Sequence, residues 1–257
     1  MTIRPWIAAS LSVLTLAAWS PTEPPVVKRY RIDFKTTQTV DLSALGQGEQ
    51  KTELSSTGFV SVTTADSAGG KAITAVLDSL TVGEGSPLPP EMAAGAKGTT
   101  WHGYQSATGK MGELKASTEN PVAAGLEGLI RSLFPPVKPG TREGATWTDT
   151  TETNTQSGLS VRTVTNYAAS GGFLDGMKVL QVAGASSQAM SGTQEGPQGS
   201  MAIEGTGGGT GTWFLGADGT TLRATYSGTQ NLAVSGSFAP EPIPVKAVVE
   251  GTSTLLK

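Results

Sequence analysis

Apolar and polar residues alternate in the first well-defined segment of the chain, residues 28–40. Tyr30, Ile32 and Phe34 occupy every second position there, and charged residues lie between them. Successive side chains of a strand point to opposite faces, so this period of two predicts a β-strand with one buried face and one wet face. A second strand is predicted within residues 49–65.

Threonine- and valine-rich segments of the same kind recur along the rest of the chain. β-Branched residues favour strands because they pack well on a pleated surface. Residues 71–82 also have apolar positions near helical spacing, so a helix is the alternative there, but Thr74, Val76 and the flanking glycines favour a strand. The other predicted strands are residues 147–155, 161–167, 177–182, 201–204, 232–238 and 245–256.

Glycine-rich stretches are predicted to separate strands. Residues 170–172 (Ser-Gly-Gly) indicate a turn, and residues 205–211 indicate a flexible or bulged connection. A phosphate-binding loop would have to open a helix and end in lysine followed by serine or threonine. The second stretch has no lysine and enters a Trp-Phe strand, so we expect no phosphate site.

One segment has the pattern of an amphipathic helix. The helix is predicted over residues 121–134, with Asn120 as its N-cap and Pro121 at the first helical position. Its apolar positions recur every three or four residues and form a single stripe, which needs a sheet to pack against. The stripe consists of Val122, Leu126, Leu129, Ile130 and Leu133. A further helical turn is expected at residues 91–94.

A tryptophan hairpin appears twice. Trp101 precedes a turn at residues 108–110, and Trp213 precedes a turn at residues 218–220. This repetition predicts two similar β halves, although chance similarity between glycine-rich hairpins is the alternative. The predicted fold is mainly β (α+β), a curved antiparallel sheet or half-barrel with one covering helix. The predicted units are a first half at 27–118, a helix and proline-rich connection at 119–145, and a second half at 146–257.

The N-terminus predicts export. Residues 1–20 contain Arg4 followed by an apolar run of about a dozen residues, which is typical of a secretory signal peptide. A cleavage site near residue 20 would be hindered by Pro21, so cleavage after Ala17 is the competing option. The alternative to a cleaved signal peptide is an uncleaved N-terminal anchor. Residues 21–26 form a proline-rich linker. The predicted location is the periplasm or the exterior of a bacterial cell.

Composition excludes several classes of function. Charged residues make up 15% of the chain and its net charge is −3, so no basic stripe predicts binding to nucleic acid. The chain has no cysteine, which excludes disulfides, thiolate metal sites, a cysteine nucleophile and a lipidated cysteine. No later apolar run is long enough to cross a bilayer, so no membrane span is expected in the mature chain.

Catalytic chemistry has few candidates. His102 is the only histidine, and no Gly-x-Ser-x-Gly motif supplies a nucleophile for it. Paired carboxylates can hydrolyse glycosides, but carboxylates on strands are ordinarily solvent-facing partners of lysine or arginine. The carboxylates near tryptophans are Glu113, Asp149, Glu152 and Glu204. We therefore expect no enzyme, no metal and no cofactor, and a glycan-acting enzyme is only a distant third hypothesis.

Large aromatic residues are the candidate ligand-binding side chains. They can stack on sugars or line an apolar groove, and in β proteins they also commonly fill the core. Both interpretations apply to Trp101, Tyr104, Trp147, Tyr167, Trp213 and Phe214.

One segment of the chain resembles a segment of known protein families. It consists of residues 133–140 (Leu-Phe-Pro-Pro-Val-Lys-Pro-Gly), followed by Thr146 and Trp147. It resembles a segment of uncharacterised bacterial extracytoplasmic domains and, more distantly, of LolA/LolB-type lipoprotein carriers. The resemblance implies a strongly curved antiparallel sheet with helical cover, whose concave side takes an acyl chain. It assigns no binding residues.

Two functional hypotheses follow. The first is a non-catalytic exported protein that binds a hydrophobic small molecule or lipid in the concavity of the sheet. The second is a structural or interaction protein of the cell envelope, with an envelope protein as its partner. A carrier needs an open, inward apolar surface. A structural protein fills that space with its own side chains, including Leu126, Ile130 and Leu133 of the helix.

Overall fold

The computed structural model describes residues 25–84, 86, 88–118, 120–154, 158–196, 199–237, 239 and 241–257. The predicted signal peptide (1–20) and residues 21–24 of the predicted linker lie outside the described residues. The described part is mainly β, as predicted, and its strands form one curved antiparallel sheet.

The sheet has eleven strands within the described residues. They are β1 (Val26–Asp41), β2 (Glu49–Ser67), β3 (Gly70–Val82), β4 (Thr100–Ser106), β5 (Lys115–Ala116), β6 (Thr146–Asn154), β7 (Leu159–Leu174), β8 (Met177–Gly196), β9 (Gly199–Leu215), β10 (Thr221–Gly236) and β11 (Ile243–Leu255). The helical segments are η1 (Ser43–Leu45), α1 (Pro90–Ala96) and α2 (Pro121–Arg131).

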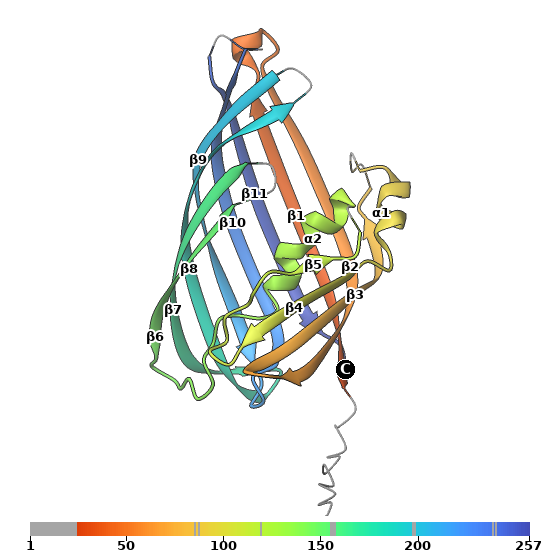
Figure 1. The fold of residues 1–257 in the computed structure, drawn as a ribbon, viewed down its shortest axis with the longest axis vertical. Coiled ribbons are helices and arrows are strands. Elements are labelled where there is room, and N and C mark those ends of the chain that lie inside the picture. The colour runs from red at the N-terminus through yellow and green to blue at the C-terminus, as the bar shows by residue number, and fades with distance from the viewer. Residues whose placement is uncertain are drawn as a thin grey trace, which may run out of the picture.

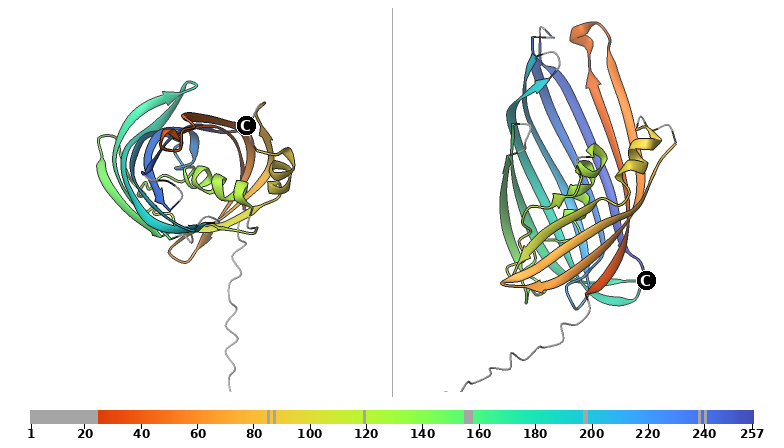
Figure 2. Two further views of the ribbon diagram at one scale, coloured as in Figure 1. Left: turned by 90° about the horizontal axis from the view of Figure 1, so that it is seen from above. Right: turned by 45° about the vertical axis from the view of Figure 1, so that its right-hand side comes forward.

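The strands follow the order β5-β4-β3-β2-β1-β11-β10-β9-β8-β7-β6. The first and last long strands therefore pair, with Phe34 opposite Gly251, and join both ends of the chain into one sheet. The segments predicted as two halves contribute β1 to β5 and β6 to β11, and their origin by duplication stays a prediction. The sheet curves strongly (Figure 1), and viewed from above it wraps around α2 (Figure 2).

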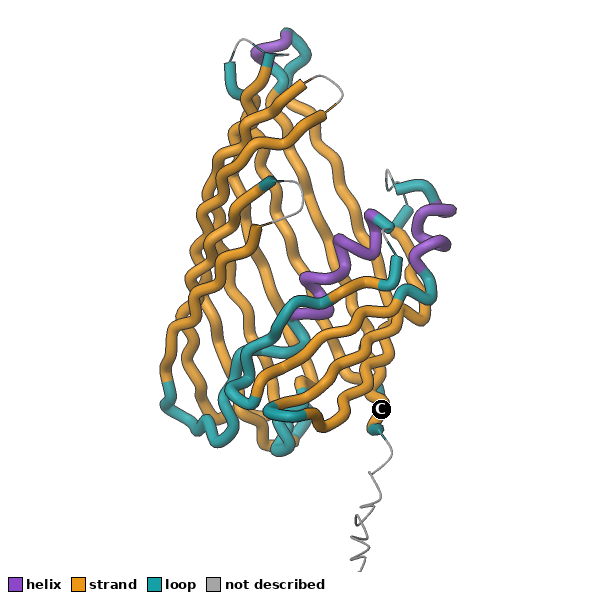
Figure 3. The backbone as a smooth tube through the Cα atoms, in the orientation of Figure 1, coloured by secondary structure: helices purple, strands orange, loops and turns teal. Residues whose placement is uncertain are grey.

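The predicted helix packs inside the concavity. The Asn120 side-chain oxygen accepts hydrogen bonds from the backbone N–H groups of Val122 (2.8 Å) and Ala123 (3.4 Å), which confirms the N-cap. The α-helix ends at Arg131, three residues earlier than predicted, and a tighter turn continues to residue 134. Most of the predicted apolar stripe is buried against Ile32 and other residues of the first strands. Figure 3 shows α2 inside the curve and α1 outside it, next to β3.

Two glycine-rich stretches were predicted wrongly as breaks between strands. Gly171 and Gly172 lie within β7, and the turn comes later, at Asp175 and Gly176, where φ is 50° and 80°. Residues 205–211 lie within β9 and pair with strands on both sides. Glycine weakens an isolated strand, but two neighbouring strands satisfy its backbone here.

The glycines of β9 have a packing role. Alternate members of the run, Gly205, Gly207, Gly209 and Gly211, share the inward face with Trp213. A β-carbon added at Gly209 would lie 2.5 Å from the Ser227 carbonyl oxygen on β10. Backbone this close leaves room only for glycine, and it lets the sheet bend tightly at this point.

Both tryptophan hairpins form. β9 and β10 are joined by a turn in which the Gly216 N–H donates to the Thr220 carbonyl oxygen. The first hairpin is shorter: β4 is followed by a bridge between Gln105 and Met111, and then by the two-residue strand β5. The strand interpretation of residues 71–82 is confirmed by β3, and the helical turn predicted at 91–94 is α1.

The β9–β10 turn is expected to contribute to acid sensitivity. The Thr220 hydroxyl (2.5 Å) and backbone N–H (2.9 Å) donate to the Asp218 carboxylate, and Lys28 adds its positive charge, which together lower the pKa of Asp218 to about 2. A carboxyl whose pKa is lowered by folding stabilises the fold above its unfolded pKa and loses that effect as pH falls through its folded pKa. The Asp218→Asn variant should therefore lose less stability than wild type between pH 3.8 and about 2.

Urea unfolding at a series of pH values measures this effect. The Asp66→Asn variant, which removes an exposed carboxylate at the end of β2, is the control and should follow the wild-type curve. Parallel curves for wild type and Asp218→Asn over this range would contradict the assignment.

Candidate functional site

The inner surface of the sheet has a row of positions occupied only by aromatic residues and glycines. Its members are in register on neighbouring strands and are called here the aromatic row: Trp147, Tyr167, Gly184, Gly211, Tyr226, Gly251 and Phe34. Each of Tyr167, Tyr226 and Phe34 has a glycine in register on a neighbouring strand, which leaves room for its ring on the concave face. A β-carbon added at Gly251 would overlap the Tyr226 phenol ring, and one at Gly211 would lie 2.5 Å from Cη2 of Trp213.

Three aromatic side chains meet at one side of this row. Trp147 and Tyr167 are stacked, with ring centroids 5.1 Å apart and planes 13° apart. The Tyr167 ring is 6.0 Å from that of Trp213, at 52°. The Trp213 indole N–H donates to the Ser132 carbonyl oxygen (2.7 Å) just after α2, which ties this cluster to the helix. Sequence alone did not indicate this convergence, since it depends on strand register.

The other three predicted aromatics lie elsewhere. Trp101 is fully buried in the core beneath α2. Tyr104 is on the outer face, where its hydroxyl donates to the Ala68 carbonyl oxygen (2.8 Å). Phe214 alternates with Trp213 and therefore faces outward. A ligand in the concavity can meet only Trp147, Tyr167 and Trp213 of the predicted set, and their role in binding stays a prediction.

Beyond the aromatic row, away from α2, the inner surface has two further zones. The nearer zone is mostly hydrophilic, apart from Val249 and Ala247 on β11. Its hydrophilic side chains are called here the polar belt: Thr36, Asp149, Thr163, Thr165, Ser186, Gln188 and Gln230. The farther zone is apolar and is called here the aliphatic band: Val40, Val161, Met190, Ile203, Leu232, Val234 and Val245. All of these side chains are half-buried, whereas α2 buries core residues at the near end of the concavity, among them Ile32 and Trp101.

Two amides of the polar belt meet across a glycine. The Gln230 side-chain N–H donates to the Gln188 side-chain oxygen at 3.4 Å, and Gly207 lies between them on β9. Neither glutamine was predicted as a site residue. The signal that would have found them is their spacing of two positions from an apolar residue. This spacing places Gln188 on the same face as Met190, and Gln230 on the same face as Leu232.

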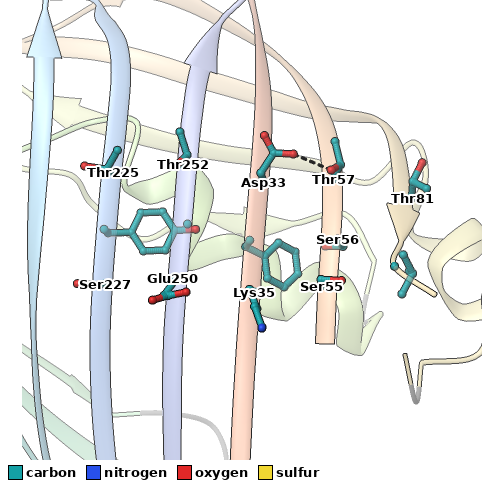
Figure 4. A pocket seen from close by; sticks show the side chains of 15 residues that line it. Asp33, Lys35, Ser55, Ser56, Thr57, Thr81, Thr225, Ser227, Glu250 and Thr252 are labelled. Atoms are coloured by element: carbon teal, nitrogen blue, oxygen red, sulfur yellow. Dashed lines mark hydrogen bonds between the residues drawn. The ribbon is translucent and has the colours of Figure 1, made fainter. Parts of the chain in front are cut away.

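The outer face has two open hollows, lined mostly by outward-facing polar residues. The first has a volume of about 580 Å³ and crosses β10, β11, β1, β2 and the end of β3. There the Thr57 hydroxyl donates to Asp33 (2.6 Å), and Glu250 and Lys35 lie on neighbouring strands (Figure 4). Lys35 is paired with Glu53 at 3.3 Å. The second hollow, of about 670 Å³, lies over β7 to β10. In the second hollow, Arg162 is paired with Glu152 at 3.5 Å.

The candidate catalytic residues are dispersed. His102 is exposed, with Nδ1 3.3 Å from the Thr74 hydroxyl. Glu113 lies between β4 and β5, near Lys115 (4.0 Å). Glu152 lies near Arg162 (3.5 Å), as expected for a solvent-facing strand carboxylate. Glu204 is exposed on the outer face, whereas Asp149 faces inward. The described part of the chain holds no group of three or more histidine, aspartate or glutamate side chains arranged to bind a metal.

Comparisons with known proteins identify no family for this chain. No family model and no curated protein matches the chain. Among solved structures, a mutant of the Rh. blastica porin is similar over 90% of this chain and 100% of its own, with 11% identity and a TM-score of 0.27. Similarity this low carries no argument. These comparisons do not support the predicted resemblance to LolA/LolB-type carriers. No helix among the described residues is long and apolar enough to cross a membrane.

Proposed function

We propose that this chain is an exported, non-catalytic protein that binds a hydrophobic ligand, a lipid or acyl chain, in the concavity of its sheet. One observation carries the proposal: the aliphatic band faces inward and remains partly exposed. An inward apolar surface not filled by the chain itself is a common sign of a ligand site. The leader pattern of residues 1–20 supports export.

The helix divides the concavity into a filled part and an accessible part. α2 buries Leu126, Ile130 and Leu133 against the near end, which accounts for the predicted filling. Residues farther along the same sheet, such as Leu232 on β10, lie beyond the helix and are partly exposed. Covering that surface with an acyl chain would gain about 25 cal/mol for each Å² of apolar surface removed from water.

The glycines of β9 keep the wall of this space smooth. Gly205 lies between Met190 and Leu232 in register, so the aliphatic side chains flank a strip of bare backbone. The backbone groups of this strip are already paired with β8 and β10, so they present no unsatisfied donors to an apolar ligand. Such a wall suits a slender chain better than a compact polar molecule.

The proposal is tested with N-phenyl-1-naphthylamine, a neutral probe that fluoresces in apolar surroundings. Wild-type protein should bind it, and Leu232→Glu should weaken binding about tenfold, or about 1.4 kcal/mol, because a carboxylate in the band opposes an apolar ligand. Asn231→Glu is the matched control, since Asn231 is the neighbouring, exposed position on the same strand and faces outward. Absence of binding to wild type, or equal effects of both variants, would contradict the proposal.

The alternative function is a structural or interaction protein of the cell envelope. It is favoured by β6, which pairs only with β7 among the described strands and leaves its other edge available to a partner strand. Native mass spectrometry of protein purified from its own host separates the two functions. A co-purified lipid mass supports the carrier, and a lipid-free protein in complex with another chain supports the alternative.

A further inference from the structure

Among the described residues of the strands, Asp149 is the one carboxylate that faces into the concavity beyond the aromatic row. Asp149 follows Trp147 by two positions on β6, so both side chains are on the inner face, and Asp149 is half-buried while Thr148 and Thr150 are exposed. The inward-facing positions described for β1, β2 and β6 to β11 in this zone include no lysine, arginine or histidine. Asp149 forms no ion pair in the described part of the chain.

The surroundings of Asp149 are aromatic. It pairs in register with Thr165, next to the stacked rings of Trp147 and Tyr167. Burial raises the pKa of Tyr167, and the negative charge of Asp149 adds to this effect, so the carboxylate is close enough to act on the phenol. The indole N–H of Trp147 is buried and has no hydrogen-bond partner within the described residues. The site thus combines an unpaired carboxylate, two rings and an unused N–H donor.

The carboxylate and the two rings of this site favour a positively charged ligand. A carboxylate forms its strongest hydrogen bonds with cationic donors, and aromatic rings attract cations through their negative faces. An anionic head group at the same place would meet the repulsion of Asp149, and the inward-facing positions described for these strands hold no basic side chain to offset it.

We infer that the ligand is an amphiphile with a cationic head group, an ammonium of the kind found on an alkylamine or an amine-bearing lipid. The ammonium binds at Asp149 beside Trp147 and Tyr167, and the apolar chain extends along the aliphatic band. The two zones adjoin on the same inner surface, with Leu232 two positions beyond Gln230 on β10. This inference rests on the proposed function and specifies the chemistry of the same site.

Competition against bound N-phenyl-1-naphthylamine tests the inference with the full mature chain. The competitors share a dodecyl chain and are used below their micelle concentrations: dodecylammonium, dodecyl maltoside and dodecyl sulfate. Dodecylammonium should compete best and dodecyl sulfate worst. The Asp149→Asn variant should bind dodecylammonium about tenfold more weakly and dodecyl maltoside almost unchanged. Glu152→Gln is the matched control, because Glu152 is on the outer face of the same strand.

Each other outcome overturns the inference in a recognisable way. Equal affinity of wild type for the three detergents removes the charge preference while leaving the proposed function intact. An equal loss of affinity for all competitors in Asp149→Asn shows a general structural role of this residue.

If spermidine, which has the cationic groups but no apolar chain, competes as well as dodecylammonium, the ligand is not an amphiphile. If Asp149→Asn only changes the oligomeric state in size-exclusion chromatography, Asp149 serves to block pairing at the β6 edge. Failure of the neutral probe itself to bind wild type contradicts the proposed function.

Discussion

Replacing Ile130 with alanine is expected to lower the free energy of unfolding by about 2–5 kcal/mol, the range for removing a large aliphatic side chain from a packed core. Ile130 is fully buried in α2, within the cluster that joins the helix to β1, β2 and β4. The loss should be near the upper end of this range, because the helix is enclosed by the sheet and cannot move far to close the cavity. Urea unfolding monitored by circular dichroism measures it.

The same helix provides a control of opposite sign. Gly128 is exposed in α2, and a β-carbon added there would meet no atom within 4 Å. Gly128→Ala should therefore raise the free energy of unfolding by about 0.4–1 kcal/mol, because alanine restricts the unfolded chain and favours helix. If both variants were equally stable, α2 would not be packed in the concavity as described.

The second large effect is expected at Gly251, on the inner face of β11. A β-carbon there would overlap the ring of Tyr226, which lies across this glycine from β10. Gly251→Ala should cost about 1–3 kcal/mol through overpacking, since the ring must leave its position. The measurement is again urea unfolding. Gly58→Ala is the matched control: Gly58 is also on the inner face, but its added β-carbon would make ordinary contacts of 3.6 Å with Leu80.

A double-mutant cycle shows the cause of the Gly251 effect. In a Tyr226→Ala background the ring is absent, so Gly251→Ala should cost less than about 0.5 kcal/mol. The difference between the two backgrounds is the coupling between ring and glycine. An undiminished cost in the Tyr226→Ala background would mean that strand pairing, and not the ring, requires glycine at this position.

Much of the local structure could be predicted because it depends on neighbours in sequence. Alternation at Tyr30, Ile32 and Phe34 predicted β1, and Asn120 followed by proline predicted the start of α2. The glycine run of β9 misled the prediction for a physical reason. Its intrinsic preference is for flexible structure, and pairing with two adjacent strands, invisible in the sequence, overrides that preference.

The candidate site was only partly predictable. The aromatic residues were recognised by type, and Trp147, Tyr167 and Trp213 do meet. The inward direction of Asp149 follows from its position two residues after Trp147, because alternate residues of a strand share a face. Its separation from basic residues depends on which strands surround it.

The sequence by itself determined which residues share a face of each strand and where α2 begins, because a strand or helix repeats with a fixed period. Only the tertiary structure decided that β1 pairs with β11, that α2 enters the concavity, and that aromatic rings lie over glycines from other strands. Those features depend on strand register and sheet curvature. Both arise from contacts between residues far apart in the chain, which no local period encodes.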